Sequence, residues 1–271
     1  VKNGQKEVFP VACEAIVKQD GKDKNDCELN AAHRLMPQIR SVLPATKYKL
    51  IGLFDGLYPN GNMIRNLQAQ AIRYIMGIKE GYVLVQVGRL RQDGALAVKE
   101  WNNEKGHRCR ASWRNGLILN GQHQDILVNY YEFEEYNKKG ERVYRNTWIT
   151  DLDITQVNIV ELVTVGRSRW KIENETFNTL KTQGYHLEHN YGHGKKNLAT
   201  NFMLLTFLAF LIDQIAQSVD VAFKKALQYC HNKKSLWEAV RSTFYVIPCR
   251  NWEQLYRIIA NEVKFKIVLL E

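Results

Sequence analysis

The most constraining feature of the sequence is the apolar run YKLIGLF at residues 48–54, which ends abruptly at Asp55-Gly56. A near-continuous apolar run of this length is typical of a β-strand that is buried on both faces. A helical pattern follows from about residue 62, and a second apolar run covers residues 73–78. Strand, helix and strand in this order predict a parallel portion of an α/β sheet.

Segments before this unit predict a short strand, a break at a proline and a second extended piece within residues 4–16. A polar loop comes next. Apolar residues at helical spacing over residues 29–43 then predict a helix, with Asp26 as its N-cap. Pro37 lies inside that pattern and should kink the helix.

The pattern changes at about residue 100. Residues 108–119, 126–136 and 143–150 are rich in aromatic and β-branched side chains, and the sequence NKKG at 137–140 predicts a turn. These features indicate a β-hairpin-rich insertion in the α/β chain.

Beyond the insertion the sequence is mainly helical. Thr155 is a suitable N-cap for a helix that runs to about Lys181, with a possible break at Gly166, and Gly184 ends it. Four further helices are predicted over residues 198–217, 219–229, 235–242 and 252–263. The apolar run 202–212 is shorter than the roughly 20 residues of a membrane span. We therefore interpret it as a buried core helix and expect no membrane association.

Composition favours a nucleic-acid partner and a reducing compartment. Lys and Arg number 38 against 28 Asp and Glu, a net charge of +10. Such a surplus favours polyanions, of which nucleic acid is the commonest. The five cysteines are scattered without a CxxC pair, which argues against a disulfide framework. From the cysteine pattern we expect a reducing compartment, such as the cytoplasm. The chain opens without Met, and we interpret it as a fragment or a processed chain.

Two carboxylates stand out by their positions. Asp55 follows a buried strand, where open α/β sheets place their ligands, although Asp-Gly is also ordinary turn chemistry. Glu173 stands four residues after Arg169, so on a helix the two share a face, and Lys181 lies two turns further on. Such a row of charges is usually a solvated salt-bridge stripe. Alternatively, Glu173 holds a metal while the two cations bind phosphates, since two-metal phosphodiester cleavage needs several carboxylates.

The segment RWKIENETFNTLKTQGYHLEHNYGHG at residues 169–194 resembles the signature helix of insertion-sequence transposases of the DDE class, the Y-R-E-K group. LFDGLYPNG at 53–61 resembles the segment with that family's second catalytic aspartate, and KNDCELNAAHR at 24–34 resembles the helix before it. The family's β insertion matches residues 100–150. The resemblance spans residues 5–215.

The resemblance implies an α/β, RNase-H-like mixed sheet with flanking helices, a β-hairpin-rich insertion and a helical C-terminal extension. It implies a core in residues 1–99 without its first strand, an insertion in 100–154, the rest of the core with the signature helix in 155–217 and an extension in 218–271. By the resemblance, Asp55 and Glu173 are catalytic ligands of Mg²⁺ or Mn²⁺. Arg169, Lys181 and Trp148 contact DNA. The implied activity is cleavage and strand transfer at transposon ends, within a homodimer.

Three departures qualify this resemblance. The tyrosine expected three residues before Arg169 is Gly166, and Lys181 lies one position too far from Glu173, which makes Glu175 a rival for the glutamate. The first catalytic aspartate has no candidate on a strand. The early aspartates lie in or beside a polar loop, at Asp20, Asp23 and Asp26. We therefore expect this chain by itself to be inactive.

Other interpretations remain open. His186, His189 and His193 with Glu188 suggest zinc, but no thiolate pair accompanies them. Lys195-Lys196 is suited either to phosphate contact or to ordinary surface charge. Non-catalytic alternatives are a truncated DNA-binding remnant and a metal-free structural protein in which Asp55 only forms a turn. The sequence has no Walker A or Rossmann fingerprint, which disfavours ATP or NAD chemistry.

Overall fold

The computed structural model describes residues 8–16, 26–192, 194 and 196–263. The chain divides into two compact units, and each is described by itself. The sheet unit comprises residues 14–169. The helical unit comprises residues 170–271 together with residues 1–13.

The sheet unit is built on one mixed β-sheet, which has six strands within the described residues, in the order β1-β2-β6-β5-β4-β3. β1 (Leu50–Phe54) and β2 (Ile72–Gly77) are parallel, and β2 pairs antiparallel with β6. The other strands form antiparallel pairs: β3 (Ala97–Asn102), β4 (Arg108–Asn120), β5 (His123–Tyr136) and β6 (Arg142–Thr150). The predicted α/β class with an RNase-H-like mixed sheet is confirmed. The hairpin-rich region continues the same sheet.

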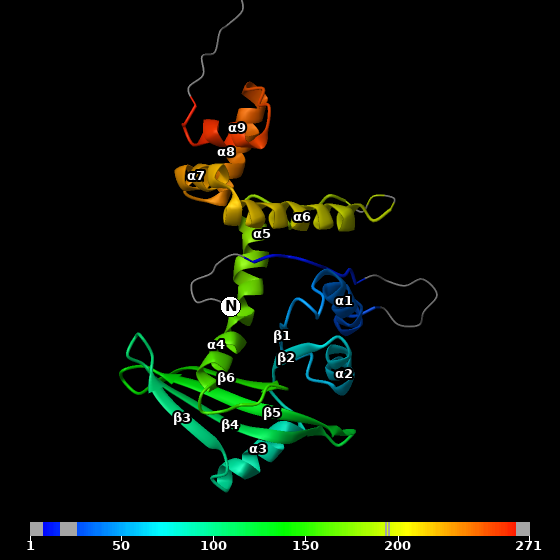
Figure 1. Ribbon diagram of the computed structural model, residues 1–271, viewed down its shortest axis with the longest axis vertical. Coiled ribbons are helices and arrows are strands. Elements are labelled where there is room, and N and C mark those ends of the chain that lie inside the picture. Colours follow the sequence, from blue (N-terminus) through cyan, green and yellow to red (C-terminus); the bar gives the residue numbers. More distant parts are fainter. Residues whose placement is uncertain (1–7, 17–25, 193, 195, 264–271) are drawn as a thin grey trace, which may run out of the picture. The chain divides into compact units, whose positions relative to one another are not determined.

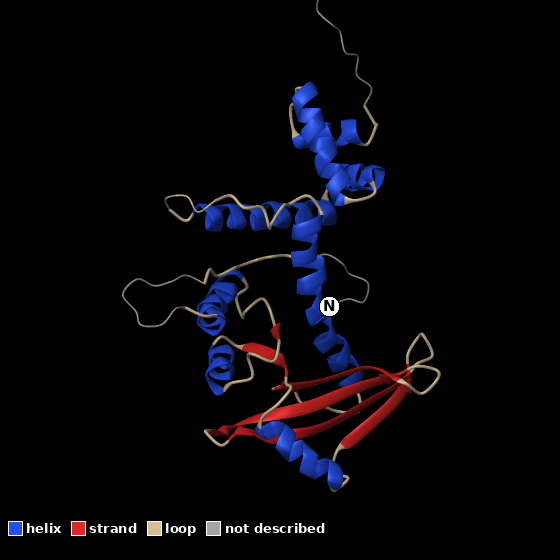
Figure 2. Cartoon of the chain, turned by 180° about the vertical axis from the view of Figure 1, so that it is seen from behind, coloured by secondary structure: helices blue, strands red, loops and turns tan. Residues whose placement is uncertain are grey.

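Alternation along the strands separates two apolar layers, one on each face of the sheet, and helices cover both faces (Figures 1 and 2 show the helices). On one face Val128 and Tyr130 of β5 join the cluster that contains helices α2 (Gly61–Ala69) and α3 (Tyr82–Gln92). On the other face Tyr131 and Phe133 of the same strand join the cluster of helix α4 (Ile159–Arg167). The sheet is thus covered by helices on both faces.

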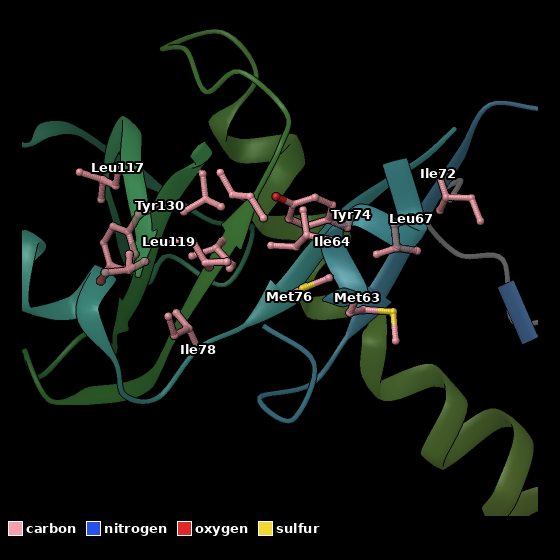
Figure 3. Close-up of a cluster of buried hydrophobic side chains, with 14 of the residues drawn as sticks. Met63, Ile64, Leu67, Ile72, Tyr74, Met76, Ile78, Leu117, Leu119 and Tyr130 are labelled. Carbon is pink, nitrogen blue, oxygen red and sulfur yellow. The ribbon is translucent and has the colours of Figure 1, made fainter. Parts of the chain in front are cut away.

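The cluster around α2 forms the core on one face of the sheet (Figure 3). Met63, Ile64 and Leu67 are each 0% exposed, as the helical pattern predicted. Gly61 begins the helix beside the β4–β5 hairpin, where a Cβ would lie 2.4 Å from the ring of His123. That close approach fixes the end of the hairpin against α2.

Several expectations for the N-terminal half were wrong. Residues 8–16 contain no regular element, and residues 4–7 lie outside the described part. β1 is not buried on both faces, because Ile51 is 44% exposed, and among the described strands β1 lies at the sheet edge. Helix α1 (Glu28–Val42) runs through Pro37 and has Cys27, not Asp26, as its N-cap. The Asp26 carboxylate instead binds Arg34, at 2.6 Å.

Two further differences concern element boundaries. α4 begins at Ile159 with Asn158 as its N-cap, while Thr155 accepts a hydrogen bond from the Asn158 backbone N–H. The predicted start of this helix is therefore too early by about one turn. α3 and β3 were not predicted at all; α3 lacks an N-terminal capping side chain, because Gly81 precedes it.

The helical unit confirms the predicted helical C-terminal extension. It contains α6 (Leu198–Val219), α7 (Val221–Cys230), α8 (Lys233–Val246) and α9 (Trp252–Ile259). Phe223, Leu236 and Leu255 are at most 2% exposed and form the centre of a core shared by α7, α8 and α9. Asp220 caps α7 and Asn232 caps α8, each by accepting hydrogen bonds from backbone N–H groups, which explains where these two helices begin.

α6 is not the buried core helix that its apolar run predicted. By length and composition alone it is apolar enough to cross a membrane. Only 17% of its most apolar stretch is buried in the structure. Leu205 and Ile212 are 58% and 57% exposed, whereas Phe210, Asp213 and Gln214 are buried. The burial of Asp213 and Gln214 shows that the packed face of this helix is partly polar. The apolar composition of the helix therefore did not predict which of its faces is buried.

Two helical glycines differ in the space around them, and we expect their replacement by alanine to have opposite effects on stability. A Cβ at Gly166 would lie 2.7 Å from the Tyr131 hydroxyl oxygen, whereas a Cβ at Gly88 of α3 meets nothing within 4 Å. We expect Gly166→Ala to lower the free energy of unfolding by about 1–3 kcal/mol through overpacking. Gly88→Ala should raise it by about 0.5–1 kcal/mol. Urea unfolding of both variants checks this, and equal effects would contradict it.

A buried carboxyl group predicts how the stability of the helical unit depends on pH. Burial raises the pKa of Asp213 from 3.8 to about 6. A hydrogen bond from Tyr185 and the charge of Lys233 act in the opposite direction and lower the pKa, but burial outweighs them. The folded state therefore binds more protons than the unfolded state between these values, and stability falls as pH rises through them. The loss amounts to about 3 kcal/mol at most.

Thermal unfolding between pH 4 and 7.5 tests this expectation. Asp213→Asn should flatten the pH dependence and stabilise the helical unit above pH 6, while Asp93→Asn, an exposed charge-matched control, should leave the profile unchanged. Parallel profiles for the wild type and Asp213→Asn would show that this carboxyl group does not control stability.

Candidate active site

An open cleft of about 790 Å³ lies in the sheet unit, beside the carboxyl ends of β1 and β2. Its lining consists of Phe54, Asp55, Gly56, Leu57, Pro59, Gly77, Ile78, Lys79, Glu80, Gly81, Tyr82, Leu119, Asn120, Asn146, Trp148 and Arg169. Three of the five predicted site residues, Asp55, Trp148 and Arg169, therefore line one cleft, although they are far apart in the sequence.

Asp55 directly follows β1 and is exposed at the cleft. Its Oδ1 atom accepts a hydrogen bond from the Leu57 backbone N–H at 2.9 Å, so the side chain does form the turn that Asp-Gly suggested. Within the described residues its Oδ2 atom makes no hydrogen bond. The turn thus orients the carboxylate and leaves one oxygen available to a ligand.

The cleft also contains polar residues that were not predicted. Lys79 and Glu80 come just after Ile78, which follows β2, whereas Asp55 directly follows β1; because these strands are parallel, their carboxyl ends meet at one edge. That strand-end rule was a usable signal for Glu80. Asn120 and Asn146 come from β4 and β6 of the hairpin region, and no local pattern identified them.

Trp148 forms part of the cleft wall but is only 2% exposed. Its ring stacks on Tyr131, with centroids 5.0 Å apart and an interplanar angle of 21°. The Tyr131 hydroxyl donates to the Leu162 carbonyl oxygen at 3.1 Å and lies against Gly166. This packing explains the glycine at the position where a tyrosine was expected, because Tyr131 and Trp148 already fill the space.

The signature segment is not a continuous α-helix. α4 ends at Arg167, and a 3₁₀ turn, η1 (Ser168–Trp170), carries Arg169. A π-helix, η2 (Ile172–Asn178), carries the exposed Glu173, and α5 (Thr179–Thr182) carries Lys181. The Lys181 ammonium group pairs with the exposed Glu188 at 2.7 Å. The expectation that Arg169, Glu173 and Lys181 lie on one face of a single α-helix is therefore wrong.

The π-helix accounts for the unusual spacing between Glu173 and Lys181. A π turn closes its hydrogen bond to the fifth residue rather than the fourth, so it holds one more residue than an α turn. The chain has one residue more than the family spacing between these positions. The extra residue can thus be accommodated within η2, and the assignment of the signature glutamate to Glu173 rather than Glu175 stays a prediction.

The described residues contain no group of three or more His, Cys, Asp or Glu side chains that could hold a metal ion. The zinc interpretation of His186, His189 and His193 stays untested, because His193 lies outside the described residues, as do Lys195, Asp20 and Asp23. The carboxylates that line the cleft and are suited to Mg²⁺ are Asp55 and Glu80. Mg²⁺ keeps several waters, so one or two protein carboxylates fit its preferences only in part.

A family model described as the transposase DDE domain matches residues 14–212, which is more than half of the chain. None of the curated proteins with which the chain was compared matches it. The matched range contains Asp55, Arg169, Glu173 and Lys181, and it includes the whole sheet of the structure. The chain therefore belongs to the transposase DDE domain family.

Proposed function

We propose that the protein is the catalytic part of a transposase that cleaves phosphodiester bonds at transposon ends and joins the freed 3′ hydroxyl to target DNA. The observation that supports this most directly is that Asp55 and Arg169 both line one open cleft at the ends of parallel strands. A carboxylate and a guanidinium group in one cleft can serve a metal ion and a phosphate, respectively.

In this proposal Asp55 and Glu173 are the metal ligands. Bound Mg²⁺ or Mn²⁺ would supply Lewis-acid stabilisation of the reacting phosphate and its leaving oxygen. The Asp55 carboxylate suits this role, because the hydrogen bond from Leu57 fixes one oxygen and orients the other. Glu173 is exposed in η2, and both residues supply the hard oxygen ligands that these cations prefer.

Arg169 and Lys181 are proposed to hold the DNA backbone. Arg169 lines the cleft, where its planar guanidinium group is suited to phosphate oxygens. Lys181 pairs with Glu188, whose side chain is 68% exposed, so DNA phosphate could replace that partner at small cost. Trp148 is proposed to support distorted bases at the cut, and its burial against Tyr131 makes it a rigid wall of the cleft.

A second candidate is a DNA-binding protein without catalytic activity. The described residues provide no group of three carboxylates, which favours this alternative for the chain by itself. Under both candidates the partner is DNA. We propose a homodimer in the synaptic complex, located in the prokaryotic cytoplasm at the nucleoid.

Substitution of the carboxylates distinguishes the two candidates. If the chain nicks supercoiled plasmid in the presence of Mg²⁺, Asp55→Asn and Glu173→Gln should each reduce that activity by about 100-fold or more, since each removes an electrostatic element of the reaction. Glu175→Gln and the exposed Asp93→Asn serve as controls and should retain most activity. DNA binding in EDTA should be unchanged in all four variants. If the wild-type chain binds DNA but does not nick it, the non-catalytic candidate is supported.

Deletion of one residue tests the role of the π-helix. Removing the exposed Asn174 should restore the family spacing, convert η2 into α-helix and retain the nicking activity. Deleting Thr182, beyond the π-helix, leaves Glu173 and Lys181 in place and is the matched control. Chemical shifts of the backbone would report the conversion. A loss of activity together with a restored α-helix would mean that the π turn itself is needed.

A further inference from the structure

A second polar pocket, of about 360 Å³, lies on the face of the sheet that carries α3. Four arginines line it: Arg91 at the end of α3, Arg110 on β4, and Arg142 and Arg145 on β6. This pocket and the cleft at Asp55 have no lining residue in common. We call these four residues the arginine pocket.

A buried carboxylate organises the inner pair of arginines. The Glu132 side chain is 5% exposed; one of its oxygens accepts from Arg91 at 2.9 Å and the other from Arg145 at 2.6 Å. Burial alone would raise the pKa of Glu132, but the hydrogen bond from Arg145 and the charge of Arg91 outweigh burial and lower it. Glu132 is therefore ionised at neutral pH, and it holds the two guanidinium groups in place.

The outer pair is held more loosely. Arg142 donates to Glu134 at 3.0 Å, and Arg110 lies 3.6 Å from the exposed Glu100. The side chains of the four arginines are 46–50% exposed. A guanidinium group has five N–H donors, and each of these carboxylates occupies only one or two of them. The pocket thus has four cations against two lining carboxylates, with donors that remain exposed.

We propose that the arginine pocket binds the phosphodiester backbone of duplex DNA, at a place separate from the catalytic cleft. Arginine held by carboxylates is pre-organised for phosphate, so less side-chain entropy is lost on binding. Among the residues that line the pocket none is aromatic, so it offers no ring on which a base could stack, and this favours contact with the DNA backbone over sequence reading. The proposal requires no metal and no cleavage, and it goes beyond the function proposed above.

The test measures binding of the full chain to a fluorescent 40-base-pair duplex of arbitrary sequence, by anisotropy in EDTA at several KCl concentrations. Arg110→Gln and Arg142→Gln should each weaken binding by about tenfold at 0.1 M KCl and reduce the salt slope by about 1. Arg65→Gln is the matched control. The Arg65 side chain is 53% exposed and pairs with Asp125, but it lines neither pocket.

Arg110→Lys keeps the charge and should retain the salt slope, which separates loss of a phosphate contact from loss of packing. Thermal unfolding of each variant verifies that it is folded. The proposal is overturned if the Arg110 and Arg142 variants bind like Arg65→Gln, or if the wild-type chain does not bind the duplex. Because no metal is present, these outcomes are independent of whether Asp55 and Glu173 are catalytic.

Discussion

The pairing of β2 with β6 is the contact on which the architecture of the sheet unit depends. It joins a parallel strand pair to four antiparallel strands, with Met76 opposite Ile149 in the register. Side chains reinforce the seam: the Thr150 hydroxyl donates to the Tyr74 carbonyl at 2.5 Å, and Asp151 accepts the Tyr74 backbone N–H at 3.0 Å. Since β6 carries Trp148 and β1 leads to Asp55, this seam is also what brings both residues to one cleft.

The parts of the fold that could be predicted from sequence are those set by local burial. Met63, Ile64 and Leu67 repeat at helical spacing because one face of α2 is fully buried, and the turn at 137–140 has Gly140 at φ +82°. Prediction failed where a distant partner decides the outcome. β1 has the composition of a central strand but lies at the edge, and Asp26 pairs with Arg34 instead of capping α1.

The same distinction applies to the functional residues. Asp55 was identifiable because a carboxylate directly after an apolar strand must either face a crevice or form a turn, and in this chain it does both. Whether it binds a metal with Glu173 stays a prediction. The arginine pocket could not be inferred from the sequence, because its residues come from one helix and two strands over positions 91–145. Along a strand they resemble the ordinary charged face of a half-exposed sheet.

The contact between Gly166 and Tyr131 has a consequence for how related chains vary. A single volume beside Trp148 is filled here from the strand, by the Tyr131 ring, and the helix contributes no side chain. In this packing a tyrosine at position 166 and a large residue at position 131 would compete for the same volume. Across the family, a larger side chain at one of these two positions should therefore accompany a smaller one at the other. Residue conservation at either position should be judged from the pair together.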